Sequence, residues 1–169
     1  MSARPPLLSS AEEAEILAGV KAGGAARRAA SERLCRALGE PLLALCLHLT
    51  GRRADAEDAT QEALVAVDRG LPSFRGEARL GTWAYRIALR AALHVRARRR
   101  DGEPLDPEPR GLAAAMARLP AEPRAVLSLF AVEGLSHAEI AAILGVPEGT
   151  VWPRLHAARR LLVESLGKK

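Results

Sequence analysis

The chain has 169 residues and a formal net charge of +5, and 22 of its 25 basic residues are arginine, which favours a polyanionic partner. Hydrophobic residues make up 49% of the chain, which excludes disorder along most of it. Aromatic and β-branched residues are few, so the composition argues against a β protein and predicts helices around a core of Leu, Ala and Val.

The first part of the chain predicts three helices separated by glycines. Ser10 and Glu13 have the spacing of a capping box that opens the first helix. A glycine ends each helix, and Pro41 stands where the first turn of a helix accepts proline. The three predicted helices cover residues 10–20, 25–38 and 41–51.

Two further helices are predicted before a linker. The first covers residues 54–69, and the second, expected to be the longest of the chain, covers residues 79–100. Residues 101–111 contain three prolines, two glycines and five charges, which is typical of a linker. The sequence therefore predicts two small helical domains, at residues 9–100 and 112–169.

The second domain carries a helix-turn-helix pattern after helices expected at 112–119 and 120–132. Ser136 and Glu139 form a second capping box, and the helix that they open ends at Gly145. A turn containing Val146 and Pro147 leads to a final, more basic helix over residues 148–166. Two short helices joined in this way are typical of a DNA-binding helix-turn-helix.

The sequence contains few signs of catalysis, metal binding or targeting. The four histidines are scattered, and neither a zinc-binding spacing nor a nucleophile or phosphate-loop motif occurs, so no enzyme, metal or cofactor is expected. Cys35 and Cys46 are expected to be reduced thiols. No run approaches the roughly 20 apolar residues of a membrane span, and the N-terminus does not resemble a signal peptide, which favours a cytoplasmic location.

One face of the predicted long helix is cationic. Seven arginines and no acid occur between Arg79 and Arg100, and Arg79, Trp83, Arg86, Arg90 and His94 share one side of the helical wheel. Arginines beside an exposed aromatic suit a nucleic-acid strand, because the guanidinium pairs with phosphate and the ring stacks on an unpaired base. A solvated basic face with Trp83 packed in the core is the alternative.

The preceding helix reverses the charge, since Asp55, Asp58 and Glu62 share a face. Acids in the first turns of a helix suit its macrodipole and also help solubility. The functional alternative is a docking surface for a basic protein partner. Charge does not decide between these interpretations.

The last helix exposes a third set of candidate residues. In a recognition helix the first exposed side chains meet base edges, and later ones meet phosphates. Pro153 cannot donate a backbone hydrogen bond to Gly149 and is expected to bend or loosen the first turns. The candidate DNA-binding residues are Trp152, Pro153, Arg154, His156, Arg159 and Arg160.

Several of these segments resemble bacterial sigma factors of the sigma-70 family, in the compact extracytoplasmic-function group. DAEDATQEA (55–63), LPSFRGEARLGTWAYRIA (71–88) and RARRR (96–100) are similar to region two. Residues 119–151 and RLHAARRLL (154–162) are similar to region four. The matches occur in the family's order and cover about residues 30–163, so both together are highly specific.

The resemblance implies a promoter-specificity subunit without catalysis of its own, whose partners are core RNA polymerase and promoter DNA. Region two implies binding and opening of the minus-ten element, and region four implies binding of the minus-thirty-five element in the major groove. The implied base pocket is Ser73, Phe74, Arg75 and Gly76. The implied strand contacts are Arg79, Trp83, Arg86 and Arg90. The implied polymerase contacts are Asp55, Asp58, Gln61 and Glu62. An anti-sigma partner and a free monomer are expected from the family alone.

The chain departs from the family at Trp152 and Pro153, where polar residues such as Lys-Ser are usual. An unusual promoter sequence, or a weaker dependence on the upstream element, is therefore hypothesised. Two alternatives remain: an operator-binding regulator that works without polymerase, and a helical adaptor that has lost DNA recognition, which Pro153 favours.

Overall fold

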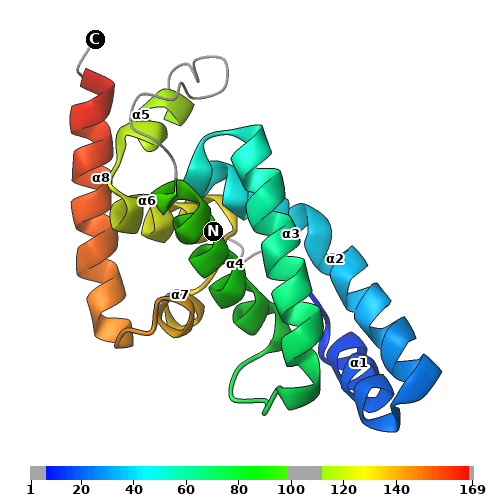
Figure 1. The fold of residues 1–169 in the computed structure, drawn as a ribbon. Coiled ribbons are helices and arrows are strands. Elements are labelled where there is room, and N and C mark those ends of the chain that lie inside the picture. Colours follow the sequence, from blue (N-terminus) through cyan, green and yellow to red (C-terminus); the bar gives the residue numbers. More distant parts are fainter. Residues whose placement is uncertain (1–6, 99–111, 168–169) are drawn as a thin grey trace.

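The computed structural model describes residues 7–98 and 112–167 (Figure 1). The first half contains α1 (Ser10–Ala22), α2 (Gly24–Thr50), α3 (Arg53–Gly70), a 3-10 turn (Leu71–Ser73) and α4 (Leu80–Ala97). The second half contains α5 (Leu112–Arg118), α6 (Ala121–Leu127), a π-helical turn (Ser128–Val132), α7 (His137–Leu144), a 3-10 turn (Glu148–Thr150) and α8 (Val151–Gly167). No strand occurs in the described ranges, and the all-α prediction is confirmed.

Helix α2 is a single helix of 27 residues, longer than α4, so the expected break at Gly39 and the expected longest helix are both wrong. It continues through Gly39 and Pro41 because one apolar stripe runs along its length. A buried leucine contributes about 1.5–3 kcal/mol, so five of them outweigh the roughly 3 kcal/mol that a proline costs inside a helix. The stripe consists of Leu34, Leu38, Leu42, Leu45 and Leu49, none more than 1% exposed.

The capping box of α1 lies one residue earlier than predicted. Ser9 Oγ accepts a hydrogen bond from the amide of Glu12 at 3.2 Å, and the Glu12 carboxylate accepts one from the amide of Ser9 at 2.8 Å. The predicted Ser10–Glu13 box is therefore wrong. Glu13 instead accepts a hydrogen bond from the amide of Leu80 at 2.7 Å. It thus caps α4, where the helix dipole favours a carboxylate.

Helix α4 is buried on two sides. Leu80, Ala84, Ala88 and Val95 form a buried apolar side. Tyr85, Leu89 and Ala92 are buried as well. The helix packs on α2 and α3 on one side and on α7 on the other, so it forms the centre of the molecule.

The predicted helix-turn-helix is present as α7 and α8. Ser136 Oγ accepts from the amide of Glu139 at 3.3 Å, and the Glu139 carboxylate accepts from the amide of Ser136 at 2.9 Å, as the capping box predicted. Gly145 ends α7 with a φ of +69°, a conformation that favours glycine. Val151 and Leu155 of α8 are fully buried against the rest of the second half.

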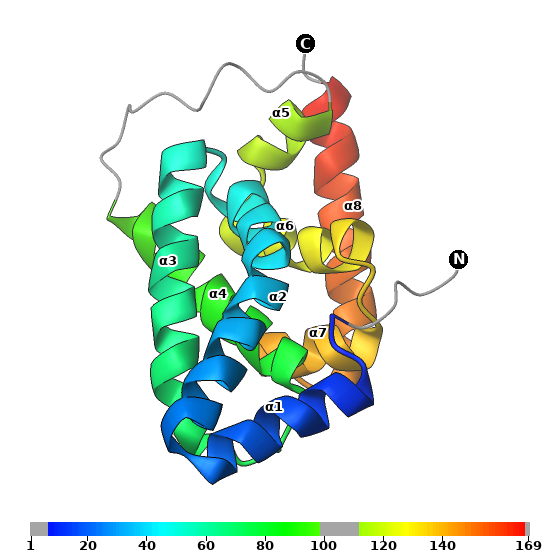
Figure 2. The same ribbon diagram turned by 90° about the vertical axis from the view of Figure 1, so that its right-hand side faces the viewer.

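The two halves share one apolar core and are joined by buried polar contacts. Figure 2 shows α6 and α7 of the second half beside α2 and α4 of the first. Arg124 of α6 is 1% exposed and donates to the carbonyl of Leu49 at 3.0 Å and to that of Leu119 at 2.9 Å. The hydroxyl of Tyr85 donates to the carboxylate of Glu133 at 2.6 Å. A buried charge is costly unless it is paired, so these contacts specify how the second half sits on α2 and α4.

The predicted linker at residues 101–111 and the last two arginines of the basic cluster, Arg99 and Arg100, lie outside the described residues. Across residues 7–98 and 112–167, no helix is both long and apolar enough to cross a bilayer.

Replacing Leu38 by alanine should lower the free energy of unfolding by about 2–5 kcal/mol, because the substitution leaves a cavity in the stripe of α2. Leu47→Ala is the matched control on the same helix, since Leu47 is 40% exposed and should change this free energy by about 0.5 kcal/mol or less. Urea unfolding followed by circular dichroism measures both. Equal effects of the two variants would contradict the assigned core.

Candidate nucleic-acid interfaces

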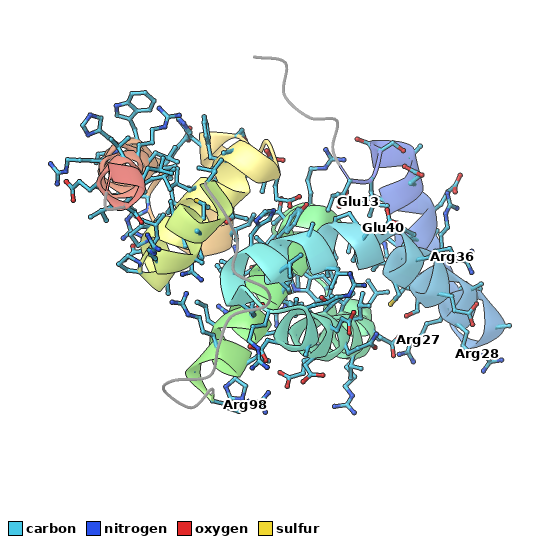
Figure 3. All side chains as sticks on the ribbon, turned by 90° about the horizontal axis from the view of Figure 1, so that it is seen from above. Glu13, Arg27, Arg28, Arg36, Glu40 and Arg98 are labelled. Atoms are coloured by element: carbon cyan, nitrogen blue, oxygen red, sulfur yellow. The ribbon has the colours of Figure 1, made fainter. Side chains whose placement is uncertain are left out.

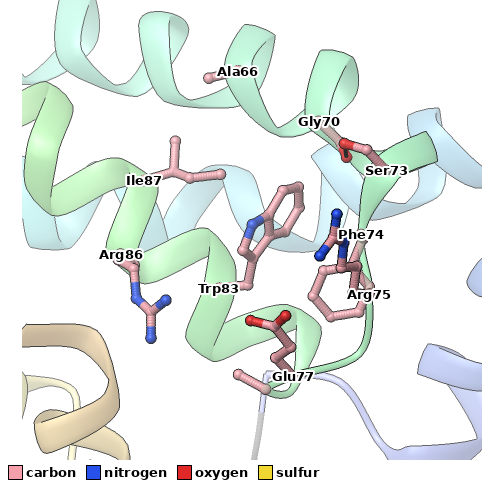
Figure 4. A pocket seen from close by; sticks show the side chains of 10 residues that line it. Ala66, Gly70, Ser73, Phe74, Arg75, Glu77, Trp83, Arg86 and Ile87 are labelled. Carbon is pink, nitrogen blue, oxygen red and sulfur yellow. Dashed lines mark hydrogen bonds between the residues drawn. The ribbon is translucent and has the colours of Figure 1, made fainter. Parts of the chain in front are cut away.

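A pocket of about 440 Å³ opens between the end of α3, the loop that follows and the first turns of α4 (Figure 4). Five of the residues predicted from the sequence line it: Ser73, Phe74, Arg75, Trp83 and Arg86. The remaining lining residues, which the sequence did not single out, are Ala66, Gly70, Glu77, Ala78 and Ile87. Gly76, Arg79 and Arg90 do not line it.

Two aromatic rings form one wall of the pocket. The ring centroids of Phe74 and Trp83 lie 5.2 Å apart with an angle of 52° between the planes. Both side chains are half-buried and pack on the core, as the alternative interpretation of Trp83 expected, and both also line the pocket. Gly70 makes room for the indole, because a Cβ at this position would lie 2.9 Å from Trp83 Cζ2.

The loop that carries Phe74 is held by short-range hydrogen bonds. Ser73 Oγ donates to the carbonyl of Gly70 at 2.9 Å, and the amide of Phe74 donates to the carbonyl of Leu71 at 3.2 Å. Gly76 has a φ of +74°, which allows the chain to turn toward α4. Arg75 is exposed beside the rings and makes no ion pair with any described residue.

The cationic face of α4 is partly used inside the molecule. Arg79 donates to the carbonyl of Leu8 at 2.6 Å and to the Glu13 carboxylate at 3.4 Å. Arg86 donates through Nε to the carbonyl of Ala142 of α7 at 3.0 Å. Arg90 is exposed and has no partner in the described part of the chain. The four residues predicted to contact a DNA strand therefore do not form one continuous accessible stripe.

The predicted acidic face of α3 contains both exposed and half-buried residues. Asp58, Gln61 and Glu62 are exposed, and the Glu62 carboxylate forms an ion pair with the guanidinium of Arg98 at 2.6 Å. The side chain of Asp55 is only 17% exposed and lies 3.7 Å from the Arg52 guanidinium in the first turn. Asp55 thus fits the macrodipole interpretation, whereas the other three residues remain accessible to a partner.

A second group of cations lies on the N-terminal half of α2, where the sequence predicted no site. Arg27, Arg28 and Arg36 lie at the periphery of the helical bundle (Figure 3). Arg33, between them, pairs with Glu15 of α1. Nothing beyond their charge points to a ligand.

Helix α8 exposes five of the six predicted residues on one side. They are Trp152, Pro153, His156, Arg159 and Arg160. Arg154 points instead toward α6, where it forms an ion pair with Glu122. Residues Glu148–Thr150 form a 3-10 turn, and α8 begins only at Val151, so the helix expected from residue 148 is not a continuous α-helix at its start. Pro153 stands in the first turn of α8, where an amide has no carbonyl partner within the helix.

Aromatic rings from three elements extend the exposed face of α8. The rings of Trp152 and His137 lie 5.9 Å apart, and those of His137 and Phe130 lie 5.6 Å apart. The Arg159 guanidinium lies 5.3 Å from the centre of the Phe130 ring, within cation–π range. Sequence reasoning missed Phe130 and His137, because no local pattern places either residue beside α8.

A groove of about 450 Å³ lies between the two halves. Three arginines, Arg86, Arg90 and Arg154, surround an apolar surface contributed by both halves, and Glu122 adds one acid. The apolar lining residues are Leu89, Leu93, Ala121, Ala125, Ile143 and Leu144. This groove depends on how the halves pack, so no sequence pattern could predict it.

Burial shifts the pKa of titratable groups in the described core. Burial raises the pKa of Cys46 to about 11, and burial lowers the pKa of His48, with the Glu133 carboxylate opposing that shift. Cys35 is half-buried, and both thiols are free. In the described part of the chain, no three metal-binding side chains come together.

Two family models match the chain. Sigma-70 region 2 matches residues 34–102, and Sigma-70, region 4 matches residues 110–162. The chain is 36% identical over 171 residues to the ECF RNA polymerase sigma factor SigM of Mycobacterium tuberculosis, a match that covers 92% of this chain and 85% of the relative. It is 32% identical over 137 residues to the ECF RNA polymerase sigma-E factor of Escherichia coli K12, covering 64% and 72%.

Two solved structures resemble the fold. CnrH in complex with the cytosolic domain of CnrY superimposes with a TM-score of 0.73 and 25% identity, over 92% of this chain and 97% of that one. The sigma factor RpoE of Bartonella quintana, in complex with the anti-sigma factor NepR, superimposes with a TM-score of 0.64 and 23% identity, over 82% and 97%. The first superposition includes both halves, so their arrangement in this chain has a counterpart.

Replacing Gly70 by alanine should displace the Trp83 indole, because the new methyl group would contact it at 2.9 Å. The expected result is a shift in Trp83 fluorescence, recorded in a Trp152→Phe background, and a loss of about 1–3 kcal/mol in the free energy of unfolding. Gly39→Ala is the matched control, since nothing lies within 4 Å of its added carbon. An unchanged emission spectrum in the Gly70 variant would contradict the assigned aromatic wall.

Proposed function

Because the chain belongs to the extracytoplasmic-function group of the sigma-70 family, whose members direct RNA polymerase to promoters and are not enzymes, we propose that its two halves bind two separate promoter elements. The first half opens the minus-ten element and holds an unpaired base. The second half binds the minus-thirty-five element as duplex DNA. The observation that carries this proposal is the pocket where Phe74 and Trp83 lie beside the exposed Arg75.

The pocket has the chemistry that an unstacked base requires. Removing a base from the stack costs a few kcal/mol, and stacking on an aromatic side chain returns roughly 1–3 kcal/mol per base. Phe74 and Trp83 offer ring surface, Ser73 and Glu77 offer polar atoms for base edges, and Arg75 offers charge for a phosphate. Gly76 supports the loop without lining the pocket.

The strand leaving the pocket would meet the cationic face of α4. Arg90 is exposed and could contact a phosphate without any change in the arrangement of the two halves. Arg86 contacts DNA only after it leaves the carbonyl of Ala142, which requires the second half to move away from α4. Arg79 donates to the carbonyl of Leu8, just before α1, and to Glu13 of α1. These bonds favour a role in holding α1 against the start of α4 rather than a direct contact with DNA.

The exposed side of α8 forms the second DNA surface in this proposal. Trp152 and Pro153 at its start would face base edges, and His156, Arg159 and Arg160 would face phosphates. Arg154 is better placed to hold α8 against α6 through Glu122. Because Pro153 fits the first turn of α8, it no longer favours the alternative that the protein is an adaptor without DNA recognition.

Core RNA polymerase would bind the acidic face of α3. Asp58, Gln61 and Glu62 are accessible, and Val65, 47% exposed, adds an apolar contact beside them. Asp55 is largely buried, so its role in this proposal is to stabilise the start of α3 through its contact with Arg52 rather than to contact polymerase. Action on polymerase and DNA also implies that the protein works in the cytoplasm.

An inhibitory protein partner fits the groove between the halves. The titles of the two similar structures name complexes with CnrY and with the anti-sigma factor NepR. In this chain, apolar side chains such as Leu89, Leu93 and Ile143 lie among three arginines. An amphipathic helix with acidic residues would complement this surface, and its binding would keep Arg86 away from DNA.

Strand capture tests the first DNA surface. Replacing Phe74 by leucine, or Arg75 by alanine, should weaken binding of a forked minus-ten probe by about tenfold, because stacking or a phosphate contact is lost. The probe carries 2-aminopurine in its unpaired strand and is titrated into the protein bound to core RNA polymerase. Arg69→Ala is the control, since Arg69 is exposed on α3 but does not line the pocket. Equal binding by all variants would refute the pocket assignment.

Polymerase affinity tests the acidic face. Asp58→Lys should weaken binding to core RNA polymerase by about tenfold, mainly through slower association, because it reverses an accessible charge. Glu148→Lys makes the same change at an exposed acid of the second half and should leave the affinity nearly unchanged. Surface plasmon resonance on immobilised core polymerase gives both rates. Identical rates for the Asp58 variant and the unmodified chain would exclude this surface.

A further inference from the structure

The exposed side of α8 begins with side chains that carry almost no hydrogen-bonding capacity. Trp152 is 56% exposed and offers a single donor, its indole N–H, and the exposed Pro153 offers none. These are the positions from which a recognition helix meets base edges. The usual readout by paired donors and acceptors is therefore absent from the start of this helix.

The Trp152 indole is supported rather than free to turn. Its ring centroid lies 5.9 Å from that of His137, and the His137 centroid lies 5.6 Å from that of Phe130. Arg159 closes this row of side chains with its guanidinium over the Phe130 ring. Because this row of rings lies against one side of the indole, ordering Trp152 on contact with a ligand should cost less conformational entropy than ordering an unsupported side chain.

One histidine and two arginines follow Trp152 along the same side of the helix. At ~100° per residue, His156, Arg159 and Arg160 lie within about 80° of Trp152 on the helical wheel. All three are exposed, so one surface combines an apolar start with polar and positively charged turns behind it, the charge coming from Arg159 and Arg160. Duplex DNA can complement this surface if its phosphates contact the arginines and an apolar group in the major groove contacts the indole.

Thymine carries the apolar group at the edge of a base pair in the major groove, its C5 methyl. We propose that Trp152 is a specificity-determining residue that reads thymine methyl groups in the upstream promoter element. The inference rests on the proposed function of the helix-turn-helix and adds the chemical feature that it recognises. Methyl contacts at Trp152 replace the hydrogen bonds that a polar side chain at this position would make.

The test removes the methyl group and nothing else. Full-length protein bound to core RNA polymerase first selects duplexes from a pool randomised over the upstream element. Each thymine of a selected element is then replaced by uracil in turn. At one or two positions, the uracil duplex should bind about fourfold more weakly, the factor that corresponds to burying one methyl-sized group.

Variants assign that loss to Trp152. Trp152→Ala should bind the thymine and uracil duplexes equally, whereas His156→Ala, changed one turn further along the same face, should bind both more weakly and keep the fourfold ratio. Trp152 is exposed, so its removal leaves the core intact. Selection of a defined element with no thymine-to-uracil effect would overturn the inference and leave the proposed function standing. Failure to select any sequence would instead count against the proposed function of this half.

Discussion

The apolar stripe of α2 is the constraint on which the rest of the structure depends. Helices α1, α3, α4, α5 and α6 all contact α2, so both halves of the protein are positioned by one element. At its C-terminal end, the carbonyl of Leu49 accepts hydrogen bonds from Arg124 and from Arg96. A guanidinium at the negative end of a helix dipole is favourable, and the burial of Arg124 makes that contact specific.

This packing decides which arginines are available for DNA. Arg86 is used to join α4 to α7, whereas Arg75 and Arg90 remain accessible on the first half. The same contacts create the groove between the halves, in which Arg86, Arg90 and Arg154 surround apolar side chains. The proposed strand-binding face and the proposed inhibitor groove share Arg86 and Arg90, so under these proposals occupation of one would oppose use of the other.

Local signals in the sequence predicted local structure well. The Ser136–Glu139 capping box, the helix-turn-helix and the aromatic and basic residues of the pocket were all predicted from spacing or resemblance. The shift from Ser10–Glu13 to Ser9–Glu12 has a simple cause: two adjacent serines precede two adjacent glutamates, and both pairs have the same spacing. What selects between them is the distant contact of Glu13 with α4, which no local pattern contains.

The remaining differences come from tertiary packing. Gly39 and Pro41 are local signals for a break, yet the leucine stripe on both sides of them is continuous and keeps the helix whole. The total charge was less informative than its distribution: Arg79, Arg86, Arg98 and Arg154 each contact another part of the protein. The sequence could not assign Phe130 and His137 to the proposed DNA surface, because their place beside Trp152 depends on how three elements meet.

The central claim is that this chain directs RNA polymerase to promoters through two separate DNA surfaces. The most direct measurement is run-off transcription by purified core RNA polymerase, with and without the chain, on a promoter library randomised over both elements. The account predicts transcripts only when the chain is present, from templates that share two conserved elements at a fixed spacing. Equal transcription in its absence, or enriched templates with no common element, would contradict it.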